Sequence, residues 1–378
     1  MVDSIQVLFR VTDRCNLNCK YCFARDFSKN HDASLELVEK TARLLKDVNH
    51  VVWIWHGSEA TVRGVDFYKE ADKILAQYNI RERNMQSNGV LLWHPEWIDY
   101  LKNSGMSISI SYDGRFQDEY RGKASEVEKS IRALRDNDIN FGSITVIGEH
   151  NVNALTDLYD DMKNVGITHW QFNTVFPSPR SDFLPADMAK VYEEQVYKTF
   201  MKYADDPNPV RVRNFEEFIP YMLGHGRFLC IFSGRCYDDF ISVTPDGDIT
   251  ICDRWFDHFV GTVDDFSSVE EILNSDWFSE VRRTKAERVE NCQKLNCPFV
   301  ELCNGGCPLN ALEGGNLSMP NEADCYERAA FITGLFRGLQ DLDLDNCKNL
   351  ILLSILEREG FRQNKFIREY IEAKEMKA

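Results

Sequence analysis

The sequence predicts an α/β fold, namely a partial (β/α)6 TIM-like barrel followed by a small cysteine-rich domain and a C-terminal helical segment. Strand-like and helix-like segments alternate through about the first 200 residues, and such units form a parallel sheet covered by helices. Three of the twelve cysteines lie before residue 23 and nine lie after residue 229, which indicates two separate cysteine-bearing modules. We therefore expect domains at 1–208, 209–335 and 336–378.

Each unit of the expected barrel has one strand and one helix. The first strand, Ile5 to Thr12, is apolar enough to be buried, and the second contains Val51-Val-Trp-Ile-Trp55. The expected strands are 5–12, 51–55, 83–86, 106–111, 141–147 and 169–175, and the expected helices are 34–47, 65–78, 95–103, 125–137, 152–165 and 186–204. Six units rather than eight predict a barrel open at one side, with right-handed crossovers. Its site should lie at the carboxyl ends of the strands.

Composition excludes several classes of protein. The 378 residues are 43% hydrophobic and 28% charged, which is typical of a folded globular chain rather than a disordered one. No apolar run reaches the roughly 20 residues of a membrane span, and the N-terminus lacks the features of a signal peptide. The net charge of −16 disfavours a nucleic-acid partner. We expect a cytoplasmic protein with neither a nucleic-acid nor a membrane partner.

The first cysteine group directly follows the first strand. In a reducing cytoplasm its thiols, Cys15, Cys19 and Cys22, point to a metal rather than to disulfides. A structural zinc site takes four protein ligands, and a [4Fe–4S] cluster takes one thiolate for each of its four irons. Three thiolates on a cluster would leave one iron open for a substrate or cofactor.

The Cys-x-x-x-Cys-x-aromatic-Cys spacing in this loop resembles the radical S-adenosylmethionine (SAM) superfamily. The resemblance implies that Cys15, Cys19 and Cys22 hold a [4Fe–4S] cluster whose open iron chelates SAM. One electron, supplied by a reductant such as flavodoxin or ferredoxin, then cleaves SAM to a 5′-deoxyadenosyl radical. Tyr21 is expected near the adenine.

Three further segments resemble motifs of the same family. Gly57-Ser-Glu-Ala60 resembles Gly-Gly-Glu-Pro, Gln86-Ser-Asn-Gly89 resembles Gln-Thr-Asn-Gly, and Ser111-Tyr-Asp-Gly114 resembles Ser-x-Asp-Gly. By this resemblance Glu59 would accept the SAM ammonium group, Ser111 would contact the ribose and Arg121 would reach the carboxylate. A turn or capping role is the alternative for each. The implied cofactor-binding residues are Tyr21, Gly57, Ser58, Glu59, Asn88, Ser111, Asp113 and Arg121.

Eight of the later cysteines make two complete four-ligand sites, for which zinc is also chemically possible. Leu302-Cys-Asn-Gly-Gly-Cys-Pro308 and the segment from Pro245 to Asp253 resemble the SPASM domain, which implies two auxiliary [4Fe–4S] clusters and three clusters in all. The implied ligands are Cys230, Cys236, Cys252 and Cys307 for the first and Cys292, Cys297, Cys303 and Cys325 for the second. Cys347 falls outside the pattern and is expected to be a plain thiol.

The resemblance implies an enzyme that modifies a polypeptide, either a precursor peptide or a sulfatase. The radical removes a hydrogen from a side-chain carbon, and the substrate then loses an electron to an auxiliary cluster and a proton to a base. Asp253 matches the Asp assigned as that base in anaerobic sulfatase maturases. The alternative is a supporting or turn residue, paired with Arg254 or Asp257.

The altered Gly57-Ser-Glu-Ala60 motif favours a maturase that cross-links a ribosomally made peptide, for example by cyclophane formation. The alternative is an anaerobic sulfatase maturase, which converts Cys or Ser to formylglycine. A third hypothesis, from another class, is a non-enzymatic metal-binding or electron-transfer scaffold, and it would require the first thiol group to be inert.

Overall fold

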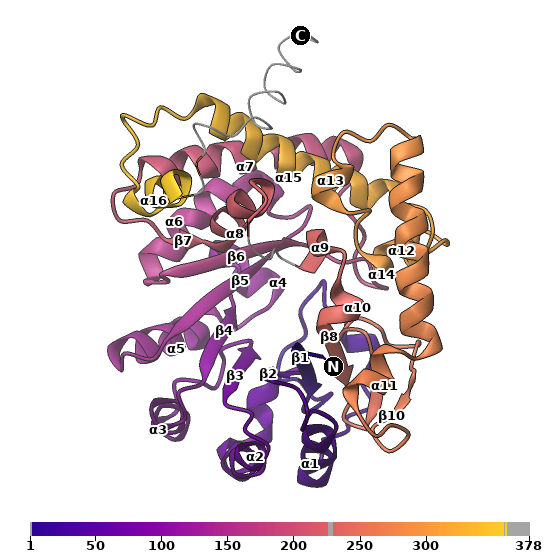
Figure 1. Ribbon diagram of the computed structural model, residues 1–378. Coiled ribbons are helices and arrows are strands. Elements are labelled where there is room, and N and C mark those ends of the chain that lie inside the picture. The colour runs from indigo at the N-terminus through magenta and orange to yellow at the C-terminus, as the bar shows by residue number, and fades with distance from the viewer. Residues whose placement is uncertain (1, 226–229, 359, 361–378) are drawn as a thin grey trace.

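The computed structural model describes residues 2–225, 230–358 and 360, which build one ten-stranded sheet flanked by helices (Figure 1). The sheet order is β10-β9-β8-β1-β2-β3-β4-β5-β6-β7, and β1 to β7 run parallel to their neighbours. The strands are β1 (Ser4–Arg10), β2 (His50–His56), β3 (Glu82–Ser87), β4 (Ser107–Ser111), β5 (Phe141–Ile147), β6 (His169–Thr174) and β7 (Arg211–Val212).

Each of the first five strands is followed by a helix on the outside of the sheet, and a longer helix follows β6 (Figure 1). These helices are α1 (Leu35–Leu44), α2 (Val65–Gln77), α3 (Pro95–Ser104), α5 (Ala124–Asp136), α6 (Leu155–Val165) and α7 (Ala186–Asp205). Shorter turns are η1 (Arg25–Phe27), η2 (Ala60–Arg63), η3 (Gly114–Phe116), α4 (Gln117–Tyr120) and η4 (Val152–Ala154). The predicted fold class is confirmed, and the first strand ends at Arg10, so its expected last residues begin the following loop.

The cysteine-rich part continues the same sheet. Strand β8 (Phe240–Val243) pairs in parallel with β1, and β9 (Asp248–Thr250) and β10 (Gly261–Thr262) extend it as antiparallel strands. Its helices are α8 (Arg213–Met222), α9 (Cys230–Ser233), α10 (Cys236–Asp239), α11 (Val269–Leu273), α12 (Asp276–Lys294), α13 (Val300–Cys303), α14 (Pro308–Glu313) and α15 (Glu322–Asp341). The expected domain boundaries at 208 and 335 stay predictions. Strands from both sides of residue 208 belong to the same sheet, and α15 runs across residue 335.

Only part of the expected C-terminal helical segment falls within the described residues. Helix α16 (Leu350–Arg358) packs beside α8, whereas residues 359 and 361–378 lie outside the described part of the chain. None of the helices in residues 2–225 and 230–358 is long and apolar enough to cross a membrane.

The two faces of the barrel strands differ in polarity. On β4, Ile108 and Ile110 are buried, whereas the serines that alternate with them are half-buried. On β2, Trp53 and Trp55 are fully buried and pack with Phe9 of β1. Because side chains alternate between faces along a strand, the apolar face meets the outer helices and the polar face lines the barrel interior. This polar interior is where the site residues gather.

Helix α15 is attached to the barrel through close contact with α7. A Cβ atom added at Gly334 would overlap the backbone carbonyl oxygen of Glu193 and crowd Val196. Arg337, one turn further along α15, pairs with Glu193 and Glu194. The missing side chain at Gly334 therefore lets the two long helices approach closely.

Replacing Gly334 by Ala should destabilise the protein. In an ordinary helix interior this change stabilises by about 1 kcal/mol, but here the added methyl meets rigid backbone, and such overpacking costs about 1–3 kcal/mol. We expect a lower urea midpoint, measured anaerobically by circular dichroism. The control is Thr333→Ala on the same helix, which should leave the midpoint nearly unchanged. A midpoint raised by G334A would contradict the close contact.

Candidate functional site

The loop after β1 is held by the loop after β2. The Thr12 hydroxyl donates to Asp32 Oδ1 over 2.6 Å, and the Arg14 guanidinium pairs with the same carboxylate at 2.6 Å. The Ser58 amide donates to the Thr12 carbonyl oxygen at 3.0 Å, and the Glu59 amide donates to the Arg14 carbonyl oxygen at 3.1 Å. These bonds fix the segment that leads into the first cysteine group.

Cys15, Cys19 and Cys22 lie together in this loop. The Cys22 amide donates to the Cys19 carbonyl oxygen at 3.3 Å, and the Leu17 amide donates to Cys15 Sγ at 3.4 Å. Burial raises the pKa of Cys15 to about 11, and the nearby Glu59, Cys19 and Cys22 raise it further. All twelve cysteines of the chain are free thiols.

The spacing of the thiols bears on which metal group they fit. Within residues 2–225 and 230–358, no three His, Cys, Asp or Glu side chains lie close enough to hold a single metal ion. A tetrahedral zinc site brings its thiolates within about 4 Å of one another, because Zn–S bonds are about 2.3 Å long. An iron–sulfur cluster is a larger body that takes each thiolate on a different iron. The thiol groups therefore fit a cluster better than a zinc ion.

Glu59, expected to bind the SAM ammonium group, is fully buried and already hydrogen-bonded. Its Oε1 accepts from the Thr61 amide at 3.0 Å, from the Thr61 hydroxyl and from the Ser87 hydroxyl at 2.8 Å, and its Oε2 accepts from the Asn88 amide at 2.6 Å. Asn88 Nδ2 in turn donates to Asn16 Oδ1 at 2.7 Å. Glu59 and Asn88 thus hold the loops after β1, β2 and β3 together.

Tyr21 and Arg121 form one hydrogen-bonded network with the buried Asp113. The Tyr21 hydroxyl donates to Asp113 Oδ2, and Arg121 Nη1 donates to the Tyr21 hydroxyl at 2.8 Å. The Val146 amide donates to Asp113 Oδ1 at 3.2 Å, which connects this network to β5. The remaining expected cofactor residue on β4, Ser111, ends that strand on the polar face. The structure therefore brings the expected cofactor residues to the carboxyl ends of β1 to β4.

The first set of later thiols is brought together from distant parts of the chain. Burial raises the pKa of Cys236 well above its ordinary value, and the adjacent Cys230, Cys307 and Cys252 raise it further. Burial likewise raises the pKa of Cys252 well above its ordinary value, and Asp253, Cys307 and Cys230 add to it. These four cysteines are the set expected to hold the first auxiliary cluster.

The thiols of the second set also lie close to one another. Burial raises the pKa of Cys325 to about 12, with further contributions from Asp324, Cys303 and Cys292. Burial raises the pKa of Cys303 to about 11, and Cys292 and Cys297 add to it. The longer spacing between Cys292 and Cys297 does not separate them, because the Cys297 amide donates to the Cys292 carbonyl oxygen at 3.0 Å.

Cys347 stands apart from all three sets. Its thiol donates to the Ala204 carbonyl oxygen at the end of α7 over 3.3 Å. This contact joins the segment before α16 to the end of α7.

Three arginines lie beside the later thiols, and of these the sequence alone pointed only to Arg254, as a possible partner of Asp253. Arg254 Nη1 lies 3.8 Å from Cys307 Sγ, and its guanidinium also bonds Asn310 and lies over the Phe176 ring. Arg328 forms a buried ion pair with Asp324 at 2.8 Å. The third, Arg288, is fully buried between the two thiol sets. In the sequence, only the closeness of Arg254 to Cys252 could have indicated an arginine beside these thiols.

Asp253, the expected base, faces the barrel rather than its sequence neighbours. Its Oδ2 lies 3.5 Å from His56 Nδ1 at the carboxyl end of β2, and His56 Nε2 lies 2.9 Å from Gln86 Oε1 on β3. Arg254 turns away towards Cys307, and Asp257 pairs with His258 at 2.6 Å. The structure thus brings the residue after Cys252 to the edge of the barrel site, beside a histidine that the sequence reading did not single out.

Family models match two parts of the chain. The radical SAM superfamily model matches residues 9–162, and the model of the SPASM iron–sulfur cluster-binding domain matches residues 235–298. Together they imply iron–sulfur clusters and SAM as cofactors.

Relatives and solved structures match most of the chain. A cysteine-type anaerobic sulfatase-maturating enzyme of Clostridium novyi is 25% identical over 81% of this chain and 88% of its own. The subtilosin biosynthesis protein AlbA of Bacillus subtilis is 24% identical over 84% and 70%, respectively. The fold is similar to that of anSMEcpe with bound AdoMet and Cp18Cys peptide (TM-score 0.76, 20% identity, 89% and 98% coverage). It is also similar to that of Streptococcus suis SuiB bound to its precursor peptide SuiA (TM-score 0.63, 15% identity, 86% and 76% coverage).

The two domain matches, the grouping of the cysteines and the shared architecture agree: this chain carries a radical SAM domain over residues 9–162 and a SPASM iron–sulfur cluster-binding domain over residues 235–298.

Proposed function

We propose that the protein is a polypeptide maturase that oxidises a side chain of a ribosomally made peptide to form a cross-link. The observation that carries the proposal is the grouping of the thiols. An open three-thiol group lies at the carboxyl ends of the barrel strands, and two four-thiol sets lie in the part that delivers Asp253 to the same edge. Relatives that mature polypeptides support this activity.

The residues fit three [4Fe–4S] clusters. In this proposal Cys15, Cys19 and Cys22 hold the SAM-binding cluster, and the two later sets hold the auxiliary clusters. When bound, these groups supply a 5′-deoxyadenosyl radical that removes a hydrogen atom from a substrate side chain, and an acceptor for the electron lost next. A small one-electron donor such as flavodoxin or ferredoxin would reduce the protein in a reducing cytoplasm.

The protein's own residues position the reactants and take up the proton. The substrate gives up a hydrogen atom, an electron and a proton, which together make a two-electron oxidation. We assign the proton to Asp253 Oδ2, since a base must lie within reach of the reacting atom. His56 holds this carboxylate from the barrel side, while the hydrogen-bonded side chains of Tyr21, Arg121 and the buried Asp113 lie at the cofactor end of the barrel.

Formylglycine formation is the second candidate. It is favoured by the similarity to sulfatase-maturating enzymes over most of both chains. Cross-linking is favoured by the altered Gly57-Ser-Glu-Ala60 motif. Mass spectrometry of the modified polypeptide substrate, with and without a hydrazide reagent, distinguishes them, because only formylglycine carries an aldehyde.

Protein purified without oxygen should contain about twelve iron atoms and as many sulfide ions per chain, as three [4Fe–4S] clusters require. With SAM and dithionite it should release 5′-deoxyadenosine, which chromatography detects. Zinc without visible absorbance, or no 5′-deoxyadenosine from iron-loaded protein, would favour the inert scaffold instead. Cys347→Ala is the control variant, because it should keep the full iron content.

Gly57→Ala should weaken SAM binding by about tenfold or more. Gly57 has φ +121°, and an added Cβ would lie 2.5 Å from the Thr12 carbonyl oxygen, so the loops after β1 and β2 would separate. Equilibrium dialysis of the anaerobic protein against labelled SAM measures the effect. Ser58→Gly restores the family's usual residue and should bind SAM normally. Unchanged binding by G57A would remove this loop contact from the cofactor site.

Asp253→Asn should lower the rate of product formation by about a hundredfold or more while 5′-deoxyadenosine is still released, because the proton loses its acceptor. The measurement follows both products in one reaction with the polypeptide substrate. The matched control is Asp257→Asn, an exposed carboxylate nearby that should leave both rates intact. Full turnover by D253N would exclude Asp253 as the base.

A further inference from the structure

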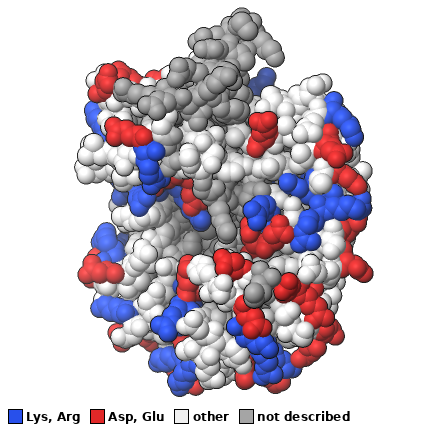
Figure 2. Space-filling view, viewed as in Figure 1, with Lys and Arg blue, Asp and Glu red and all other residues white. Residues whose placement is uncertain are grey.

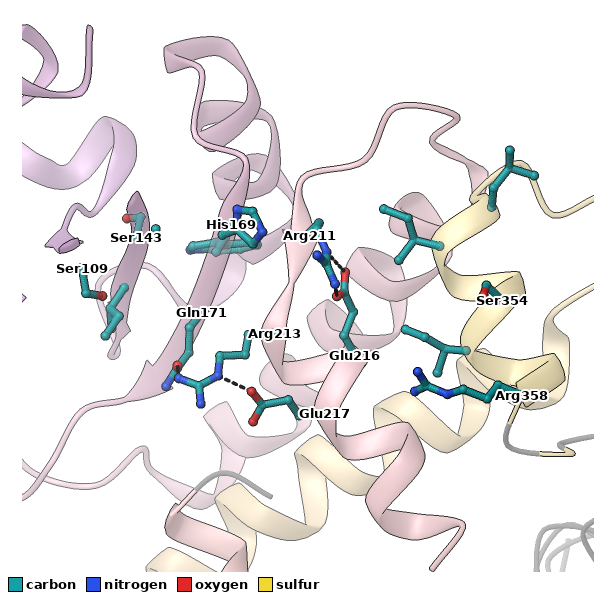
Figure 3. A pocket seen from close by; sticks show the side chains of 16 residues that line it. Ser109, Ser143, His169, Gln171, Arg211, Arg213, Glu216, Glu217, Ser354 and Arg358 are labelled. Carbon is teal, nitrogen blue, oxygen red and sulfur yellow. Dashed lines mark hydrogen bonds and ion pairs between the residues drawn. The ribbon is translucent and has the colours of Figure 1, made fainter. Parts of the chain in front are cut away.

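A large cavity opens on the polar face of the barrel, away from the thiols. It has a volume of about 760 Å³, well beyond a single side chain and within the range of ligand pockets. Figure 3 shows Ser109 and Ser143 on the strands at one side, Ser354 and Arg358 on α16 at the other, and Gln171 and Arg213 between them. In Figure 2 this face of the molecule is hollowed between the part that carries α16 and the part that carries β2 and β3.

The wall formed by α16 is apolar. Leu350, Ile351 and Ile355 all line the cavity, and the side chain of Leu350 is 74% exposed although Leu352 of the same helix is fully buried. Exposed aliphatic side chains on a cavity wall favour a ligand that covers them. Neither family model matches this helix, which lies after residue 298.

The charged groups in the cavity are largely paired with one another. Arg211 pairs with Glu216 at 2.6 Å, and Arg213 pairs with Glu217 and donates to Gln171 Oε1 at 3.1 Å (Figure 3). A site for a phosphate or nucleotide would aim its arginines at the ligand instead. Neutral hydrogen-bonding groups beside an aliphatic wall fit a stretch of polypeptide, with its amide groups and side chains.

A polar row on adjacent strands connects the cavity with Asp253. Asp253 contacts His56 on β2, His56 bonds Gln86 on β3, and Gln86 is in register with Ser109 of β4 at the cavity edge. Neighbouring strands lie about 4.8 Å apart, so Ser109 is about 10 Å across the sheet from His56 and β6 is about 19 Å away. An extended chain covers these distances in about three and six residues.

We propose that this cavity binds the part of the polypeptide substrate that lies about three to six residues from the modified residue, with an aliphatic side chain against α16. The inference rests on the proposed function, since it takes the reacting residue to lie beside Asp253. It gives α16 a role in substrate choice.

The test uses random twelve-residue peptides on a display library, selected anaerobically on the cluster-loaded protein, with enriched peptides resynthesised and their affinity measured by fluorescence anisotropy. Wild-type protein should enrich peptides that contain an aliphatic residue. Leu350→Glu, at a position too exposed to affect folding, and Ser354→Trp, which fills the cavity, should each weaken their binding by about tenfold or more. Met319→Glu, an exposed apolar residue elsewhere, should leave the affinity unchanged.

Release of 5′-deoxyadenosine in the absence of peptide distinguishes a failure of the cavity proposal from a failure of the proposed radical chemistry. L350E and S354W should retain it, because neither residue belongs to the cofactor site. If it is retained but no peptide is enriched, or enriched peptides bind equally to wild type and both variants, the cavity proposal is overturned and the radical chemistry stands. Equal binding would leave the chain's own C-terminal residues or a second copy as the occupant. Loss of 5′-deoxyadenosine in wild type itself would instead overturn the proposed function.

Discussion

The buried carboxylate of Glu59 constrains the rest of the cofactor end of the barrel. A buried carboxylate is costly unless donors surround it, and here the donors come from its own loop and from the loop after β3. Asn88, one of these donors, reaches on to Asn16 beside Cys15. The position of the loop that carries the first three thiols therefore depends on the Glu59 carboxylate. Without this carboxylate, the loops after β1, β2 and β3 would lose the hydrogen bonds that join them.

The sheet also fixes the position of the cysteine-rich part relative to the barrel. Strand β8 lies directly against β1, with Gln6 opposite Phe240 and Phe9 opposite Val243. The segment after β8 and β9 carries Cys252 and Asp253, so their approach to the barrel edge is set by strand register rather than by a flexible linker. The close contact of α15 with α7 fixes the other side of the same module. A hydrogen abstraction followed by electron and proton loss needs such rigidity, because a displacement of 1 Å costs catalysis heavily.

Local sequence patterns were enough to predict the parallel units, and burial alternates along β2, β4 and β5. The spacing around Cys303 and Cys307 carried the family resemblance, and that resemblance implied the cysteine sets. Other features depend on contacts between residues far apart in sequence, which leave no local pattern. The pairing of β8 with β1, the approach of His56 to Asp253 and the hydrogen bonds that Glu59 accepts are of this kind. For Glu59 the motif implied an acceptor for a ligand, whereas its donors within the chain, Ser87 and Asn88, are visible only in the folded protein.

The placement of Arg254, Arg288 and Arg328 explains how an acidic chain accommodates eight thiolates in one small module. The chain carries a net charge of −16, yet these three cations lie at or beneath the surface beside the two later thiol sets. Buried negative charge requires nearby positive charge or hydrogen bonds, and both are present where Arg254 meets Cys307. In the proposed function these thiols hold the auxiliary clusters, and the reduction potential of thiolate-bound iron rises with such neighbours. The three arginines would then also favour uptake of the electron that the proposed oxidation beside Asp253 releases.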